Sequence, residues 1–335
     1  MKQDYPFISK EVLCRLFGKT RHAYYDHGWR HRDQSLKDDI ILQLVHQIRN
    51  TSLPRLGTRK LLALLTPELD SHQIHVGRDY LFDLLAEHKL LIRRRKRKVF
   101  TTDSRHWMRK YANLTKDLVI TRPEQLWVSD ITYIRMGNQW GYLSLVTDAY
   151  SRKIMGIGFR SDLLALGCLE ALQMAFDNRS YGQHPLIHHS DRGCQYCCKE
   201  YVDLLNAHHV AVSMTERGDP YENALAERMN GIIKGEFNLY SSQESFENTC
   251  QRIVKSVEAY NEIRPHGSCD NLTPSQAHKK EGELKKRWKN YPKKMFKNLV
   301  PGSKEEAGRL PSKSKPPPLP YGHQNKGLPL IIDYV

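Results

Sequence analysis

Long apolar runs are missing from this sequence, which has a mean hydropathy of −0.63. No stretch approaches the roughly 20 apolar residues that a bilayer-spanning helix needs. The first residues, Met1 to Pro6, also lack the hydrophobic segment of a secretion signal. We therefore expect a cytoplasmic protein that makes no contact with a membrane.

Cysteine is scarce, and its spacing indicates no paired site. The chain has 7 cysteines, an odd number that fits a reducing compartment better than a disulfide scaffold. Cys194, Cys197 and Cys198 lie close together, but Cys250 and Cys269 do not supply the second pair that a structural zinc site requires. These thiols are therefore predicted to be ordinary buried or surface residues.

Acidic residues are in the minority, with 37 Asp and Glu against 52 Lys and Arg, a formal net charge of +15 and a pI of about 9.4. The excess lies near the front, because residues 1–110 contain 23 Lys or Arg and 12 Asp or Glu. It includes a continuous basic run: Arg93, Arg94, Arg95, Lys96, Arg97 and Lys98. Such a run favours salt-sensitive binding to double-stranded DNA and a location on the nucleoid; a solvated linker is the alternative.

Three acidic residues, Asp130, Asp191 and Glu227, each end or interrupt an apolar segment. Asp130 lies within residues 126–134 and Asp191 closes residues 186–191, and both segments are typical of buried strands. Ligands bind where the strands of an open α/β sheet end. Carboxylates brought there from distant segments can hold two divalent cations, and their hard oxygens favour Mg²⁺, for which Mn²⁺ can substitute.

Glu227 belongs to a predicted helix that is capped near Asn223 and continues to Lys234. Its apolar stripe should face the core and consists of Leu225, Met229, Ile232 and Ile233. The opposite side carries Glu227, Asn230, Gly231 and Lys234, a face suited to approach a phosphate backbone. Asn230 and Lys234 are thus predicted DNA contacts; an ordinary amphipathic helix is the alternative.

Four longer motifs contain these residues: WVSDITYI at 127–134, GYLSLVTDAYSR at 141–152, HHSDRGCQY at 188–196 and GDPYENALAERMNGIIKGE at 218–236. Together they resemble the integrase-like core of bacterial insertion-sequence transposases. The resemblance implies a DDE transposase of the copy-out-paste-in kind, in which Asp130, Asp191 and Glu227 are the metal-binding catalytic triad. Such an enzyme cleaves the ends of its element and then joins them to target DNA by strand transfer.

The resemblance also implies partners. The element's terminal repeats and the target DNA would be bound by a homodimer or a higher synaptic complex. The chain looks like the second-reading-frame product of such elements, which often acts as a fusion with an upstream-frame partner. A catalytically inactive DNA-binding regulator of the element is the alternative function, and a nuclease that only hydrolyses DNA is a lesser one.

The fold class expected for the core is α/β, a ribonuclease-H-like five-stranded mixed sheet flanked by helices and preceded by an all-α helix-turn-helix region. Asp148 is expected to form a turn between strands. His188 and His189 adjoin Asp191, but neighbouring strand residues point to opposite faces, so at most one can approach the metals.

Five domains or segments are predicted along the chain. A helix-turn-helix at 1–35 and a second module with the basic run at 36–100 contain separate helices at 21–27 and 38–49 among others, with Arg21 and Arg78 on DNA-reading helices. The remaining parts are a linker at 101–122, the catalytic core at 123–284 and a basic, Pro-rich tail at 285–335 that is expected to be disordered.

Overall fold

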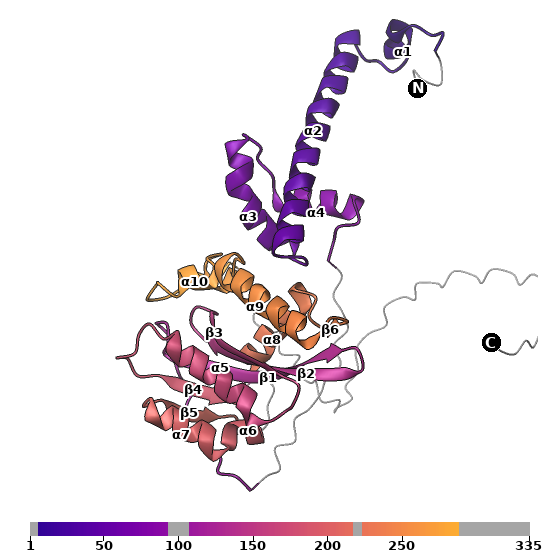
Figure 1. Ribbon diagram of the computed structural model, residues 1–335. Helices are drawn as coiled ribbons and strands as arrows, with labels where there is room; N and C mark the ends of the chain where they lie inside the picture. The colour runs from indigo at the N-terminus through magenta and orange to yellow at the C-terminus, as the bar shows by residue number, and fades with distance from the viewer. Residues whose placement is uncertain (1–5, 93–106, 217–222, 288–335) are drawn as a thin grey trace, which may run out of the picture. The chain divides into compact units, whose positions relative to one another are not determined.

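The computed structural model of the chain describes residues 6–92, 107–216 and 223–287 (Figure 1). The front of the chain is entirely helical, as predicted. Its helices are α1 (Lys10–Leu16), α2 (Arg21–Thr51), α3 (Thr58–Ser71) and α4 (Arg78–Glu87). The basic run at 93–98 lies outside the described residues, so its contact with DNA stays a prediction.

The helix α2 corrects the sequence-based division of this region. The helices expected at 21–27 and 38–49 are one continuous helix of 31 residues, and the predicted boundary after residue 35 falls inside it. No proline interrupts the intervening residues, and the single Gly28 costs only about 1 kcal/mol of helix stability. Thr20 caps the helix through a hydrogen bond from the amide of Ala23, 3.1 Å long.

The core is a mixed sheet in the order β3-β2-β1-β4-β5, which confirms the five-stranded ribonuclease-H-like fold. The strands β1, β2 and β3 are antiparallel to one another, whereas β4 and β5 run parallel to β1. A two-residue strand, β6, also pairs with β1. The strand bounds are β1 Leu126–Met136, β2 Gln139–Asp148, β3 Ile154–Arg160, β4 Ile187–Ser190, β5 Ala211–Met214 and β6 Ser241–Ser242.

Helices cover both faces of this sheet (Figure 1). On one face, Leu172 of α5 and Leu205 of α7 pack in a buried cluster with Trp127 of β1. On the other, Met229 of α8 and Ile253 of α9 belong to a second buried cluster. The helix bounds are α5 Ala165–Asp177, α6 Cys194–Cys197, α7 Lys199–Ala207, α8 Ala224–Glu236, α9 Phe246–Glu262 and α10 Pro274–Ala277, with a 3₁₀ turn at Gly267–Cys269.

Glycine on β3 allows α5 to approach the sheet closely. A Cβ atom at Gly156 would lie 1.9 Å from the carbonyl oxygen of Ala171, and one at Gly158 would lie 2.0 Å from that of Gly167. Real side chains cannot occupy such positions, so the helix backbone rests directly on the strand. This contact fixes α5, the crossover helix that leads to β4 and Asp191.

The segment predicted as a linker, residues 101–122, is described from residue 107 onward and packs on the core. The amide of Leu114 donates to Ser213 Oγ at 2.9 Å, and the amide of Met214 donates to the carbonyl of Ala112 at 3.4 Å. This segment therefore lies along β5, because the edge strand offers it hydrogen-bonding groups. Most of the predicted tail, from residue 288 on, lies outside the described residues.

Among the residues that the structure describes, no helix is long and apolar enough to cross a membrane.

Candidate active site

Asp130 and Asp191 lie on neighbouring parallel strands at the centre of the sheet. In the β1–β4 pairing, Val128 is opposite His189, so Asp130 and Asp191 each follow this pair by two residues. Asp191 comes directly after the last residue of β4. The sheet topology therefore brings together two carboxylates that are 61 positions apart in the sequence.

Helix α8 brings Glu227 near enough to Asp130 for its charge to raise the pKa of that carboxyl. Asn223 occupies its N-cap position, but the side chain makes no capping hydrogen bond. Instead, Asn223 Nδ2 donates to the carbonyl oxygen of Ser129 at 3.1 Å, which ties the start of α8 to the residue before Asp130. Glu227 lies in the first turn of the helix, with its side chain exposed to solvent.

Asn230, which the sequence predicts as a DNA contact, is buried beside Asp130. It is 4% exposed, and its Nδ2 donates to Asp130 Oδ2 at 2.8 Å. The amide of Ile131 donates to the other oxygen of Asp130, Oδ1, at 3.0 Å. Asn230 therefore orients the carboxylate of Asp130, a predicted metal ligand; its position one turn after Glu227 was right, but its solvent exposure was not.

Asp191 is fixed by a local turn. Its Oδ1 accepts a hydrogen bond from the amide of Gly193 at 3.0 Å, at the start of α6. A Cβ atom at Gly193 would lie 3.1 Å from the same oxygen, so a side chain there would crowd the carboxylate. This explains locally why glycine follows the aspartate by two residues.

Asp130 is buried close to two further carboxylates. Burial, and then the charge of Asp191, raise the pKa of Asp130 to about 7, although the hydrogen bond from Asn230 opposes the shift; the charge of Glu227 raises it further. Like charges that approach in a poorly solvated place disfavour ionisation. A bound divalent cation would remove this penalty, so the donor set fits the metal predicted from the sequence.

No three His, Cys, Asp or Glu side chains enclose a single ion anywhere in residues 6–92, 107–216 or 223–287. Asp130, Asp191 and Glu227 therefore do not form a ready three-ligand group in this structure, and their joint binding of a metal stays a prediction. The cysteine cluster forms no three-ligand group in the described residues either, and all 7 cysteines are free thiols.

Neither histidine beside Asp191 is exposed. His188 Nε2 lies 2.8 Å from Ser129 Oγ and 3.0 Å from the hydroxyl of Tyr201, and burial lowers the pKa of His188 to about 3. His189 Nδ1 lies 2.8 Å from Ser213 Oγ. Both rings therefore hold strands and α7 together inside the core, which is compatible with the prediction that at most one could approach the metals.

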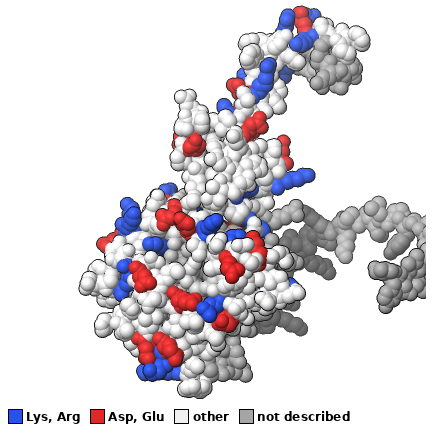
Figure 2. Space-filling model, viewed as in Figure 1, with Lys and Arg blue, Asp and Glu red and all other residues white. Residues whose placement is uncertain are grey.

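The other predicted DNA contacts in the described residues lie on helices. Lys234 Nζ donates to the carbonyl of Tyr133 at 3.4 Å and lies 5.7 Å from the centre of the Tyr240 ring. Arg21 begins α2, and Arg78 begins α4, where it pairs with Asp79 at 2.7 Å. The face drawn in Figure 2 intersperses Lys and Arg with Asp and Glu. DNA contact by these three residues stays a prediction.

Comparison with known proteins identifies the family of this chain. Two family models, both described as integrase core domain, match residues 120–220 and 208–274. An insertion element IS600 uncharacterized 31 kDa protein of Shigella sonnei is 30% identical over 278 residues, which are 81% of this chain and 99% of that protein. The chain belongs to the insertion-sequence DDE transposase family.

Transposase InsF for insertion sequence IS3A, from Escherichia coli strain K12, is 33% identical over 166 residues, 49% of this chain and 57% of InsF. Among solved structures, the HTLV-2 integrase catalytic core domain in complex with magnesium has a TM-score of 0.38 and 21% identity, covering 47% of this chain and 97% of its own. A chain of the simian T-cell lymphotropic virus intasome has a TM-score of 0.42 and 16% identity, and the match covers 74% of this chain and 77% of that chain. The fold assignment of this transposase depends on its own sheet order and on the family models.

Proposed function

We propose that this transposase cleaves the ends of its insertion sequence and joins them to target DNA by two-metal-ion phosphodiester chemistry, with Mg²⁺ as the physiological ion and Mn²⁺ as a substitute. The observation that carries the proposal is the setting of Asp130: burial, then the charge of Asp191 and then that of Glu227 raise its pKa to about 7. A buried carboxylate beside like charges is costly unless a cation joins them.

Each residue has a distinct role in this proposal. Asp130, Asp191 and Glu227 hold the cations, which when bound would supply charge stabilisation for the attacking and leaving oxygens of the phosphodiester. Asn230 orients Asp130 through the 2.8 Å hydrogen bond, and Asn223 fixes the first turn of α8 against Ser129. Because these supports belong to a rigid strand and helix, the carboxylates are preorganised for the reaction.

The DNA partners in this proposal are the element's terminal repeats and the target. Because two element ends must be held together while each is joined, a homodimer or a higher synaptic complex is required. The helices of the front region, the basic run at 93–98 and Lys234 would contact DNA by neutralising its phosphates. An upstream-frame fusion partner would add further DNA-binding and oligomerisation segments.

The decisive assay incubates the full chain with labelled terminal DNA and Mg²⁺ and scores cleavage and joining separately. Asp191→Asn removes one charged ligand without removing a predicted phosphate contact, so both reactions should disappear while binding to terminal DNA changes by less than about twofold. Asp203→Asn is the matched control, because Asp203 is an exposed residue that pairs with Lys199 at 2.9 Å, and it should react normally.

Joining activity retained by Asp191→Asn in Mg²⁺ would reject the assigned triad. Binding without any cleavage or joining by the unaltered chain, in the presence of the fusion partner, would favour the inactive regulator. Cleavage without joining would favour a nuclease that only hydrolyses DNA.

A further inference from the structure

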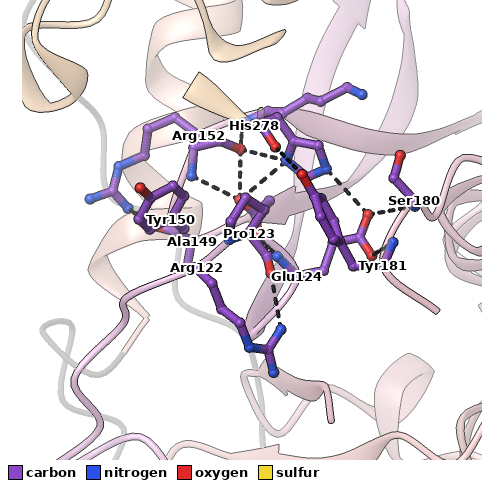
Figure 3. Close-up of polar contacts among 12 residues, drawn as sticks. Arg122, Pro123, Glu124, Ala149, Tyr150, Arg152, Ser180, Tyr181 and His278 are labelled. Atoms are coloured by element: carbon purple, nitrogen blue, oxygen red, sulfur yellow. Dashed lines mark hydrogen bonds and ion pairs between the residues drawn. The ribbon is translucent and has the colours of Figure 1, made fainter. Parts of the chain in front are cut away.

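A second group of acidic residues is buried in the core, away from the triad (Figure 3). Glu124 lies just before β1, and Asp148 is the last residue of β2; both are 0% exposed. Between them lies His278, which directly follows α10 and is 4% exposed. Its Nε2 is 3.2 Å from Glu124 Oε1, and its Nδ1 is 2.9 Å from Ser151 Oγ.

The groups that contact the Glu124 carboxylate can all act as donors. The amides of Ser180 and Tyr181 each donate to it at 2.8 Å, and Arg179 Nε lies 3.5 Å away. Burial opposes its ionisation, but the hydrogen bonds from His278 and these amides outweigh burial and lower the pKa of Glu124. Glu124 is therefore an ionised acceptor, so the Nε2 of His278 must carry a proton to bind it.

Ser151 determines the state of the other ring nitrogen. Its single hydroxyl proton is donated to Asp148 Oδ2 at 2.6 Å, and that carboxylate also accepts from the amides of Glu124 and Ser151. Ser151 Oγ accepts from the amide of Lys153 at 3.2 Å. With its proton already used, Ser151 Oγ can bind the Nδ1 of His278 only by accepting from it. Both ring nitrogens of His278 are thus donors.

From this hydrogen-bond pattern we infer that His278 is a buried imidazolium ion that clamps the C-terminal strap, residues 273–287, onto the sheet and makes the strength of that attachment depend on pH. The strap has further polar contacts with the core. The amide of Gly282 donates to the carbonyl of Thr121 at 2.8 Å, and the hydroxyl of Tyr150 donates to the carbonyl of Gly282 at 2.9 Å. The hydroxyl of Tyr181 donates to the carbonyl of His278 at 3.1 Å.

The surroundings of His278 favour its charged form. Glu124, just before β1, and Asp148, at the end of β2, face it from the same end of this antiparallel strand pair, and the ring of Tyr181 lies edge-on at 5.8 Å. Lys153 opposes the charge, and Arg179 lies beyond Glu124. Burial lowers the pKa of His278, but the hydrogen bonds with Asp148 and Glu124 outweigh it, so that the pKa is raised.

The sign of the pH dependence follows from this shift. A histidine whose pKa is higher in the folded state stabilises that state fully below its unfolded pKa of about 6.5, and the stabilisation is lost as the pH rises through the folded value. After deprotonation of His278, the single hydroxyl proton of Ser151 could be donated to Asp148 or to His278, but not to both. The strap, which leads to residues 288–335 and exposes Lys279 and Lys280, should therefore loosen at alkaline pH.

The test uses the full chain labelled with ¹⁵N in histidine. At pH 7, both ring nitrogens of His278 should carry protons, and they should remain protonated to a higher pH than those of His184, an exposed histidine in the neighbouring loop. The resonances are identified by their loss in His278→Gln and His184→Gln. One bare ring nitrogen on His278 at pH 7 would overturn the inference.

Hydrogen exchange at the strap amides supplies a test on the unaltered chain. After correction for intrinsic exchange, the amides of His278 and Gly282 should open at least about tenfold more often at pH 9 than at pH 7, the change that one pKa unit represents. This dependence should vanish in His278→Gln and persist in His184→Gln. A dependence that persists in His278→Gln would assign it to another group.

Discussion

The core holds acidic side chains in two places, and the contrast between them separates the proposed active site from a structural cluster. Around Glu124 and Asp148, the polar contacts come from donors, and the pKa of Glu124 is lowered. Around Asp130, the neighbours include two further carboxylates, and its pKa is raised to about 7. The sequence shows acidic residues at both places. The two places differ in the groups that surround these carboxylates.

This contrast teaches that the number of carboxylates in a cluster does not by itself indicate a metal site. His278 supplies an internal cation for the first cluster, which needs nothing from outside the chain. Asp130 accepts hydrogen bonds from the side-chain amide of Asn230 and from the backbone amide of Ile131, neither of which carries a charge. A group left in this state stores free energy that cation binding can release.

The largest effect is expected from Asp130→Asn. Cleavage and joining should fall by a factor on the order of 10³ or more, because a charged ligand is lost. Without metal at pH 8, however, the variant should unfold at a higher temperature than the unaltered chain, since it removes a buried like charge; each kcal/mol corresponds to ~2–4 °C. Calorimetry in a chelator checks this, and a lower unfolding temperature would show that Asp130 is already compensated.

Asn230→Ala should have an intermediate effect. Loss of the hydrogen bond to Asp130 should reduce metal-dependent joining by about 10–100-fold, as for other residues that orient metal ligands. Binding to terminal DNA, measured by titration, should not change, because Asn230 is buried beside Asp130. A loss of binding with normal catalysis would restore the role in DNA contact that the sequence suggested.

Glu124→Gln should lower the free energy of unfolding and leave cleavage and joining unchanged. The change leaves His278 facing a weaker acceptor and should cost about 1–3 kcal/mol of unfolding free energy, with joining unchanged at a permissive temperature. Chemical denaturation and the joining assay on the same preparation measure both quantities. If Glu124→Gln abolished joining while remaining folded, the two clusters would not be separable.

The smallest effect concerns the basic run at 93–98. Neutralising three of its residues should reduce the slope of DNA affinity against salt by roughly one unit per lost phosphate contact. The control removes three exposed core lysines, Lys199, Lys255 and Lys286, and should leave the slope nearer its original value. An unchanged slope in the basic-run variant would place that run away from the DNA.

The sequence predicted the strand order and the positions of Asp130 and Asp191 on neighbouring strands, because strand ends are marked by local residue patterns. Asp148 was also correctly assigned to a turn, since its carboxylate accepts from the amide and hydroxyl of Ser151. These features depend on residues that are neighbours in the chain.

The sequence did not predict features that depend on distant contacts. Helical periodicity placed Asn230 beside Glu227, but only the packing of α8 on β1 shows that this face is partly buried. The partnership of Glu124 with His278 joins residues 154 positions apart, and no local signal marks it. Similarly, nothing in residues 107–122 indicates that β5 would hold them.

The most direct test of the central claim is a titration of the full chain with Mn²⁺. The unbound ion is measured by its electron paramagnetic resonance signal. At pH 8 the unaltered chain should bind Mn²⁺, and binding should weaken as the pH falls below about 7, where protons compete for Asp130. Asp130→Asn should lose this binding, and Glu124→Gln should keep it. Equal uptake by Asp130→Asn and the unaltered chain would contradict the account.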